Sequence, residues 1–340
     1  MEIKPYLRTK NHKNILTILT ITYILIIIVW ENIMTEVLEL IEKTKIENAS
    51  FFDLSYLEIK KLPREIGQLT NLHHLNISGN HITELPMEIG QLTNLRYLNI
   101  SENKISQLPP EIGKLTNLEY FYIQLSKLPP EIGQLTSRQL KLLSCLEINN
   151  NEITTLPPEI GQLANLKILD ISGNQISELP PEIGKLSKLE RLTISGNQIS
   201  KLPAEIGELG KLECLNISGN QLTQLPKEIG QLSKLEVLNI SHNQLTQLPK
   251  EIGQLGNLRL LRIFNNCLAT LPPEIGQLKN LESLEIYDNQ IVSLPPEIQQ
   301  LSNLKEIKIF NNPITQLPPE IGQLTNLEYL YLSQNQVIYQ

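Results

Sequence analysis

Residues with the chemistry for catalysis or metal binding are few in this chain. His73, His74 and His81 come closest to a metal-binding cluster. His73 and His74 are adjacent, so on a strand their side chains would point to opposite faces. The sequence contains no phosphate-binding loop, no His-Glu-x-x-His motif, no Cys-x-x-Cys pair and no Gly-x-Ser-x-Gly elbow. We therefore predict no enzyme activity, no metal site and no cofactor.

The cysteines and the glycosylation motifs bear on the compartment. Cys145, Cys214 and Cys267 are odd in number and scattered through the interior of the chain, which is typical of free thiols in a reducing compartment. Four Asn-Ile-Ser motifs would place glycans in the middle of predicted strands, at Asn76, Asn99, Asn216 and Asn239. Both observations predict a cytoplasmic location.

A 23-residue repeat fills most of the 340-residue chain and positions its side chains. Leu-Pro pairs recur at Pro63, Pro86 and Pro109, and again at Pro157, Pro180, Pro203, Pro226, Pro249, Pro272, Pro295 and Pro318. Pro129 lies out of phase between the two runs. A fixed period in this range predicts a solenoid, in which each unit buries its apolar face against its neighbours.

Each repeat divides into two parts, as residues 166–188 illustrate. Leu166, Leu169, Ile171 and Asn174 form a Leu-x-x-Leu-x-Ile-x-x-Asn pattern, which predicts a short strand followed by an Asn that bonds to backbone groups. The Pro-x-Glu-Ile-Gly motif predicts one or two turns of 3₁₀ or α-helix on the outer face, ended by the Gly. Gln299 replaces this Gly once, so we expect a strained or different turn there.

The motif Leu-Pro-x-Glu-Ile-Gly-x-Leu-x-x-Leu resembles the leucine-rich repeat over residues 49–340. Its class is similar to repeats of plant intracellular Ras-group-related, Shoc2-like and bacterial Roco-type proteins. The resemblance implies an α/β solenoid, a curved horseshoe with a parallel β-sheet on the concave face and short 3₁₀ or α turns on the convex face. It also implies protein binding. We expect about twelve repeats, with the stack bulged or kinked by irregular spacing between residues 109 and 157.

The charge of the chain gives no sign of a nucleic-acid partner. The net charge is −7, and twelve of the 36 acidic residues occupy the Glu position of the helical motif, so the acidity is mostly architectural. No basic stripe follows the repeats, which excludes nucleic-acid binding.

Aromatic and charged residues replace small polar ones in the C-terminal repeats. The residue after the core Ile, usually Ser, becomes Phe264, Tyr287 and Phe310. Two positions earlier stand Arg262, Glu285, Lys308 and Tyr331. Equivalent positions on neighbouring parallel strands lie about 4.8 Å apart, so these seven residues predict an aromatic ladder beside a row of alternating charge. Aromatic residues and Arg are enriched in interface hot spots, which predicts a partner-binding site for a protein.

Two further interpretations of the exposed aromatics stay open. The ladder could shield the sheet near its end, with the charges paired laterally. A secondary patch for partner binding comprises Tyr97, Tyr120 and Tyr122, next to the irregular repeats.

The N-terminal residues differ from the repeats. Residues 1–33 form a hydrophobic segment that is either a signal anchor or sequence from a wrongly assigned start. Residues 15–30 are apolar, and only if they are a real anchor do we expect membrane contact, with the repeats outside. Residues 34–48 predict an amphipathic capping helix, with Thr35 at its start.

The predicted function is a non-catalytic protein–protein interaction module, an intracellular signalling scaffold that binds a protein on its concave face. One alternative is the sensor arm of a truncated Roco-like GTPase, and another is a membrane-anchored surface receptor or adhesin. No polar cap follows the last strand, residues 327–332, so that edge is also available for self-association.

Overall fold

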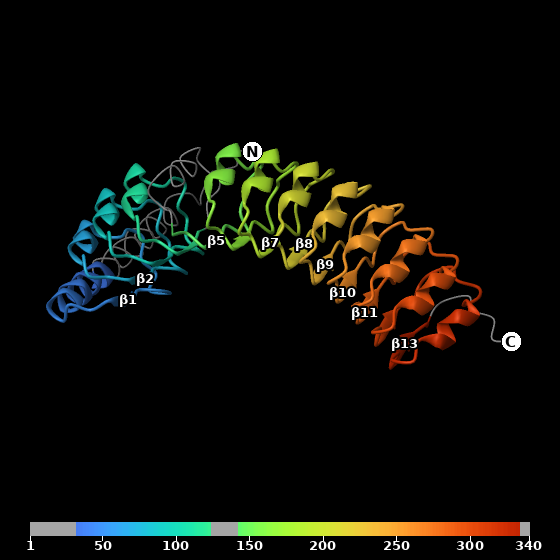
Figure 1. Cartoon of the computed structure of the whole chain (residues 1–340). Helices are drawn as coiled ribbons and strands as arrows, with labels where there is room; N and C mark the ends of the chain where they lie inside the picture. Colours follow the sequence, from blue (N-terminus) through green and yellow to red (C-terminus); the bar gives the residue numbers. More distant parts are fainter. Residues whose placement is uncertain (1–31, 124–141, 334–340) are drawn as a thin grey trace, which may run out of the picture.

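The computed structural model describes residues 32–123 and 142–333, which form one curved stack (Figure 1). A 13-stranded sheet runs in the order of the chain from β1 to β13, and each strand pairs in parallel with the next. The sheet lines the concave side of the arc, and the short helices follow its outer side (Figure 1). The predicted curved solenoid with a concave parallel sheet is therefore confirmed.

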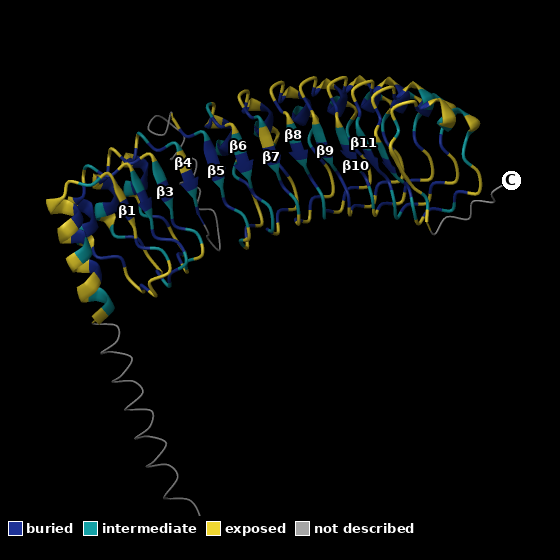
Figure 2. Ribbon diagram, turned by 90° about the horizontal axis from the view of Figure 1, so that it is seen from below, coloured by how far each residue is buried: buried dark blue, intermediate teal, exposed yellow. Residues whose placement is uncertain are grey.

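Every strand is three residues long, and the middle residue is buried in all of them except β13. The strands are β1 (Phe51–Asp53), β2 (His74–Asn76), β3 (Tyr97–Asn99), β4 (Tyr120–Tyr122), β5 (Cys145–Glu147), β6 (Ile168–Asp170), β7 (Arg191–Thr193), β8 (Cys214–Asn216), β9 (Val237–Asn239), β10 (Leu260–Arg262), β11 (Ser283–Glu285), β12 (Glu306–Lys308) and β13 (Tyr329–Tyr331). The first and third residues of each strand face the concave surface, because side chains alternate along a strand. Figure 2 looks onto this surface.

The sheet continues through the irregular region. Phe121 on β4 pairs with Leu146 on β5, although 25 residues separate them instead of 23. Residues 124–141, which would carry the expected bulge, lie outside the described part of the chain. The flanking strands keep the register of the rest of the sheet.

The Pro-x-Glu-Ile motif forms five-residue 3₁₀ helices. They are η1 (Arg64–Gln68), η2 (Met87–Gln91), η3 (Pro110–Lys114), η5 (Pro158–Gln162), η6 (Pro181–Lys185), η7 (Ala204–Glu208), η8 (Lys227–Gln231), η9 (Lys250–Gln254), η10 (Pro273–Gln277), η11 (Pro296–Gln300) and η12 (Pro319–Gln323). A Pro in extended conformation precedes each one, and the carbonyl of that Pro accepts the N–H of the Ile, as Pro203 does from Ile206 at 3.1 Å. The fixed φ of Pro therefore sets the direction of each helix.

The Gly of the motif has a different role from the one expected. None of these Gly residues has the positive φ of a helix-ending Gly. A Cβ on Gly207 would instead lie 2.6 Å from the carbonyl oxygen of Glu228 in the next repeat, so Gly permits close stacking. Gln299, which replaces it once, lies in η11, a five-residue 3₁₀ helix like the others. The expectation of a different turn at Gln299 was wrong.

Stacked Leu and Ile side chains form the core, and a row of Asn residues closes one edge of it. Asn220 donates from Nδ2 to the carbonyls of Ile194 (3.0 Å) and Ile217 (3.1 Å), and its Oδ1 accepts the N–H of Ile199 (3.0 Å). The bonds reach back to the preceding repeat as well as within the same one. The prediction that these Asn residues are structural is confirmed.

A helix over residues 32–46 packs against the first repeat. Its Val37 and Ile41 are buried in the core, and Ile33 packs there partly buried. Because residues 32–34 are already helical, Thr35 lies within the helix and does not begin it. In the part of the chain that the structure describes, no helix combines the length and apolar character needed to cross a bilayer. Residues 15–30 lie outside that part.

Candidate functional site

The three C-terminal aromatics form a ladder on the concave side. Phe264, Tyr287 and Phe310 each follow the core Ile that comes after β10, β11 and β12, so the parallel register sets them side by side. The rings of Phe264 and Tyr287 stack with centroids 4.3 Å apart and planes 8° apart. Those of Tyr287 and Phe310 stack at 4.4 Å and 12°. His242 meets the ring of Phe264 edge-on at 5.1 Å. The rings therefore present a row of edges to solvent.

A row of charged residues lies beside the ladder. We call this row closed because its members, Arg262, Glu285 and Lys308, are ion-paired with one another. Glu285 is only 7% exposed and lies between Arg262 Nε and Lys308 Nζ, each 3.1 Å from one of its carboxylate oxygens. Burial opposes the charge of Lys308, yet its bonds to Glu285 raise the pKa of Lys308 above the ordinary value of 10.5. The lateral pairing expected under the shielding interpretation is therefore present. It also holds these side chains in one arrangement.

A second charged row, which was not predicted from the sequence, lies just before the same strands. Arg259, Glu282 and Lys305 precede β10, β11 and β12, and Glu282 contacts Arg259 at 2.7 Å and Lys305 at 2.8 Å. The same 23-residue spacing in the printed sequence could have revealed it. Lys305 and Arg259 lower the pKa of Glu282 through their hydrogen bonds to its carboxylate.

Tyr331 lies next to this site without joining the ladder. It is paired in register with Lys308, and its ring lies 6.4 Å from that of Tyr329 on the same strand. Both tyrosines are exposed, as is Leu330 between them. The seven predicted residues thus lie on neighbouring strands, with six of them in two rows and Tyr331 at the edge.

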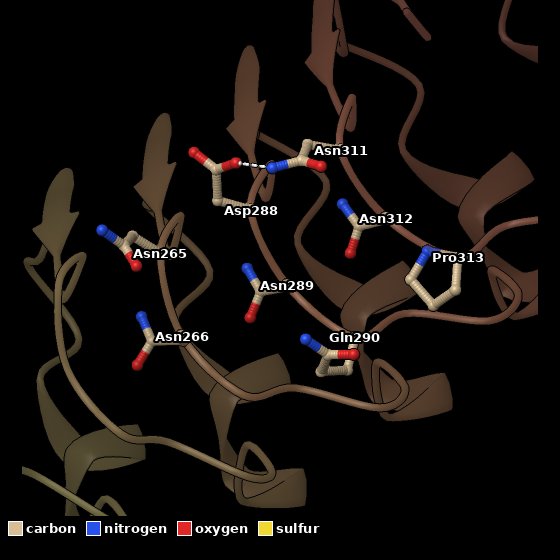
Figure 3. A pocket seen from close by; sticks show the side chains of 8 residues that line it. All are labelled: Asn265, Asn266, Asp288, Asn289, Gln290, Asn311, Asn312 and Pro313. Atoms are coloured by element: carbon tan, nitrogen blue, oxygen red, sulfur yellow. Dashed lines mark hydrogen bonds between the residues drawn. The ribbon is translucent and has the colours of Figure 1, made fainter. Parts of the chain in front are cut away.

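A polar hollow of about 610 Å³ adjoins the ladder, where the loops leave the strands (Figure 3). Asn265, Asp288 and Asn311 line it, and each has a positive φ of 53–54°. Gly219 occupies the same position in an earlier repeat, and Asn and Asp are the other residues that tolerate this conformation. Asn311 donates to the Asp288 carboxylate. The change from Gly to Asn and Asp adds hydrogen-bonding groups beside the aromatic rings.

The secondary patch is longer than predicted. Phe51 stacks on His74 at 4.5 Å, and His74 stacks on Tyr97 at 3.9 Å and 6°. The Tyr97 ring then lies 5.2 Å from that of Tyr122 and 6.4 Å from that of Tyr120, both tilted. Phe51 and His74 were not predicted as members of this patch, although both occupy the strand position of Tyr97 in earlier repeats.

The histidines and cysteines of the described residues form no metal-binding cluster. His74 is a stacking ring, and burial lowers its pKa below 6.5 although Asp53 opposes the shift. His81 pairs with Glu58 at 2.7 Å. Within residues 32–123 and 142–333 no group of three metal-ligating side chains is found. Burial raises the pKa of the free Cys145 thiol to about 11.

Comparison with known proteins identifies the repeat. A model of the leucine-rich repeat region matches residues 138–217, 204–290 and 250–338, and a second leucine-rich repeat model matches residues 70–128. Neither model describes a catalytic domain. Among curated proteins, no significant match is found.

Solved structures agree with this assignment. A leucine-rich repeat protein of Leptospira interrogans is 35% identical, with 87% of this chain and 93% of that chain covered and a TM-score of 0.60. The plant peptide hormone receptor RGFR1, in complex with RGF2, is 33% identical, with 81% of this chain but only 45% of that chain covered and a TM-score of 0.69. An internalin from Listeria monocytogenes shares the fold at 22% identity, 86% and 88% coverage and a TM-score of 0.67. The chain therefore belongs to the leucine-rich repeat family.

Proposed function

We propose that this chain is a non-catalytic protein-interaction module that binds a protein or peptide partner on its concave face. The observation that carries the proposal is the ladder of Phe264, Tyr287 and Phe310 beside the closed charge row of Arg262, Glu285 and Lys308. Aromatic and Arg side chains held rigidly in this way lose little conformational entropy when a partner binds.

The fold itself does not require aromatics at these positions. Ser195, Ser218 and Ser241 occupy the same place in the preceding repeats, whose core is equally buried. Ser333 occupies this position after β13, the last strand described, so the ladder is confined to three successive repeats. Contact with a partner explains why aromatics replace Ser in these repeats alone among the neighbouring ones.

The relatives support binding of this kind. RGFR1, 33% identical to this chain, was solved in complex with RGF2. By analogy, an extended segment of a partner could lie across the concave strands, with its side chains against the ladder and its backbone near the amides of Asn265 and Asn311.

A capture experiment tests the site. The full chain, the variant Phe264→Ser/Tyr287→Ser/Phe310→Ser and a control, Met87→Ser/Val292→Ser, serve as baits in the native host lysate. Met87 and Val292 are exposed apolar residues outside the strands. A protein held by the wild type and the control is expected to bind the ladder variant at least about 30-fold more weakly, since hot-spot aromatics contribute about 2 kcal/mol or more. Equal affinity for all three baits would refute the site.

Within this function we propose a cytoplasmic signalling scaffold of the class with the Leu-Pro-x-Glu-Ile-Gly-x-Leu motif. Its support is the set of three free cysteines, Cys145, Cys214 and Cys267. A membrane-anchored receptor is the second candidate, favoured by the apolar residues 15–30 and the likeness to RGFR1. Fractionation of host cells expressing the chain with and without residues 1–33 separates them. Loss from the membrane fraction on deletion supports the receptor, and a soluble full chain supports the scaffold.

A further inference from the structure

The two ends of the concave face differ in charge as well as in the position of their aromatics. The third residue of each strand forms one row along the face. In the C-terminal repeats this row carries the ion-paired Arg262, Glu285 and Lys308. Toward the N-terminus it carries three carboxylates, on Asp53, Glu147 and Asp170.

Glu147 and Asp170 stand directly beside each other without a cation between them. They are register partners on β5 and β6, about 4.8 Å apart along the row. Like charges in this relation destabilise a sheet. Burial and the neighbouring Asp170 raise the pKa of Glu147. Among residues 32–123 and 142–333 no ion pair involves either carboxylate. Asp170 accepts the N–H of Ser172 at 2.9 Å and the amide of Asn149 at 3.4 Å, and the charge of Arg191 partly offsets the raised pKa of Glu147.

The other described lysine and arginine side chains near this face already form ion pairs with glutamates. Arg96 pairs with Glu119 at 3.5 Å, and Lys167 pairs with Glu190 at 2.9 Å. His74 is held toward its neutral form because burial lowers its pKa. The described part of the N-terminal face therefore carries more carboxylates than cations, with Asp53, Glu147 and Asp170 set against Arg191.

Aromatic rings adjoin these carboxylates. Tyr122 on β4 is the register partner of Glu147, and the Tyr122 ring lies 5.2 Å from that of Tyr97. The sulfur of Cys145 lies 4.0 Å from the Tyr122 hydroxyl and 3.8 Å from a Glu147 carboxylate oxygen. His74 covers one face of the Tyr97 ring, whereas the Tyr122 ring is tilted by 40° from that of Tyr97 and is not stacked on it. A ring surface and carboxylates side by side attract one kind of group, a cation with an apolar stem.

We propose that the N-terminal concave face receives a basic segment of the protein partner, with a lysine or arginine side chain lying against Tyr97 and Tyr122 and ion-paired to Glu147 and Asp170. The proposal rests on the proposed function, since it assigns chemistry to part of the same partner. Because the C-terminal row is ion-paired within itself, the charge fixes the direction in which the partner lies along the sheet. An acidic partner such as a nucleic acid is repelled.

The test uses the full chain and the pentapeptide acetyl-Gly-Arg-Gly-Arg-Gly-amide, with the corresponding Glu peptide as a second probe. Binding is followed by isothermal titration calorimetry at low salt, which reads every variant in the same way. The variant Glu147→Gln/Asp170→Asn should bind the Arg peptide at least about tenfold more weakly, since two charge-assisted bonds are lost. It should fold, because Asn occupies the position of Asp170 in β2, β3, β8 and β9.

Two control variants isolate the site. Glu178→Gln/Glu208→Gln removes the same charge from exposed positions outside the strands and should bind the Arg peptide as the wild type does. The variant Tyr97→Leu/Tyr122→Leu keeps apolar side chains and should lose about tenfold in affinity through the missing ring faces. Equal binding of the Arg peptide by all variants, or equal binding of the Glu peptide by the wild type, would overturn the proposal.

The ladder variant distinguishes this proposal from the proposed function. Phe264→Ser/Tyr287→Ser/Phe310→Ser should bind the Arg peptide like the wild type, because its substitutions lie at the other end of the sheet (Figure 1). If partner capture proves independent of the ladder, the Arg peptide still reports on the N-terminal face. Loss of Arg peptide binding in the ladder variant would show that the peptide binds elsewhere and would overturn the proposal.

Discussion

Substitution of Asn220 by Ala tests the structural role of the Asn row. The Asn220 side chain is 7% exposed and makes four hydrogen bonds, three from Nδ2 and one to Oδ1. The Nδ2 bonds go to the carbonyls of Ile194, Ile217 and Ser218, and Oδ1 accepts the N–H of Ile199. The variant Asn220→Ala removes all four at once.

The four bonds are not equally important. The carbonyl of Ile194 also accepts from Asn197, and that of Ile217 also accepts from Asn243. The neighbouring Asn residues therefore leave these carbonyls bonded. Oδ1 of Asn220 is the one acceptor found for the N–H of Ile199 within the described residues, and Ile199 is fully buried. Its loss leaves a buried donor unsatisfied.

The lost hydrogen bonds set the expected decrease in the free energy of unfolding. An unsatisfied buried donor costs about 1–3 kcal/mol, and the weaker loss at the shared carbonyls adds about 1 kcal/mol. We expect Asn220→Ala to lower the free energy of unfolding by about 2–4 kcal/mol, measured by urea denaturation of the full chain with circular dichroism. Because neighbouring repeats stabilise one another, the midpoint should fall for the stack as a whole.

A matched variant provides the control. Asn257 makes one exposed bond, from Nδ2 to the carbonyl of Ser233 at 2.7 Å, so Asn257→Ala should change stability by less than about 0.5 kcal/mol. Equal losses for Asn220→Ala and Asn257→Ala would refute the reasoning, since buried and exposed amides would then count alike.

Two further predictions concern packing and thiol reactivity. Gly207→Ala should destabilise the chain by about 1–3 kcal/mol in urea, because the new Cβ meets the backbone oxygen of Glu228. Gly210→Ala should not, because the nearest atom to its new Cβ would lie 4.0 Å away at an ordinary contact distance; equal effects would rule out close stacking. At pH 8, Cys145, whose pKa is raised to about 11, should react with iodoacetamide far more slowly than the exposed Cys267, and faster as the pH rises. Similar rates by mass spectrometry would contradict the burial of Cys145.

Much of the fold follows from the period of the sequence. Leu169 and Ile171 indicate the strand at β6, and the fixed spacing of their equivalents predicts parallel pairing of each repeat with the next. The Asn positions follow from the backbone groups left unpaired after each strand. These features depend only on the local motif and its period, and both can be read from a single sequence.

Contacts across repeats were harder to predict. The role of Gly207 depends on how closely the following repeat approaches, and no property of the single motif gives that distance. His74 was considered as a metal ligand, and its stacking against Phe51 and Tyr97 emerges only when three repeats are aligned at one strand position. Tyr331 matches the charged row in the sequence, but its ring pairs with Tyr329 on its own strand.

In this stack, side chains on the concave face contact the equivalent side chains 23 residues before and after them. Glu285 and Asp170 occupy the same place in their repeats, and the shared register gives each a neighbour on both sides. Glu285 has cations on both sides, and Asp170 has Glu147 on one of them. The donors Ser172 and Asn149 at Asp170 and the raised pKa of Glu147 relieve part of the repulsion in the second arrangement. In the binding mode proposed above, a cation of the partner relieves the remainder, and the difference between the two charge rows distinguishes one end of the partner from the other.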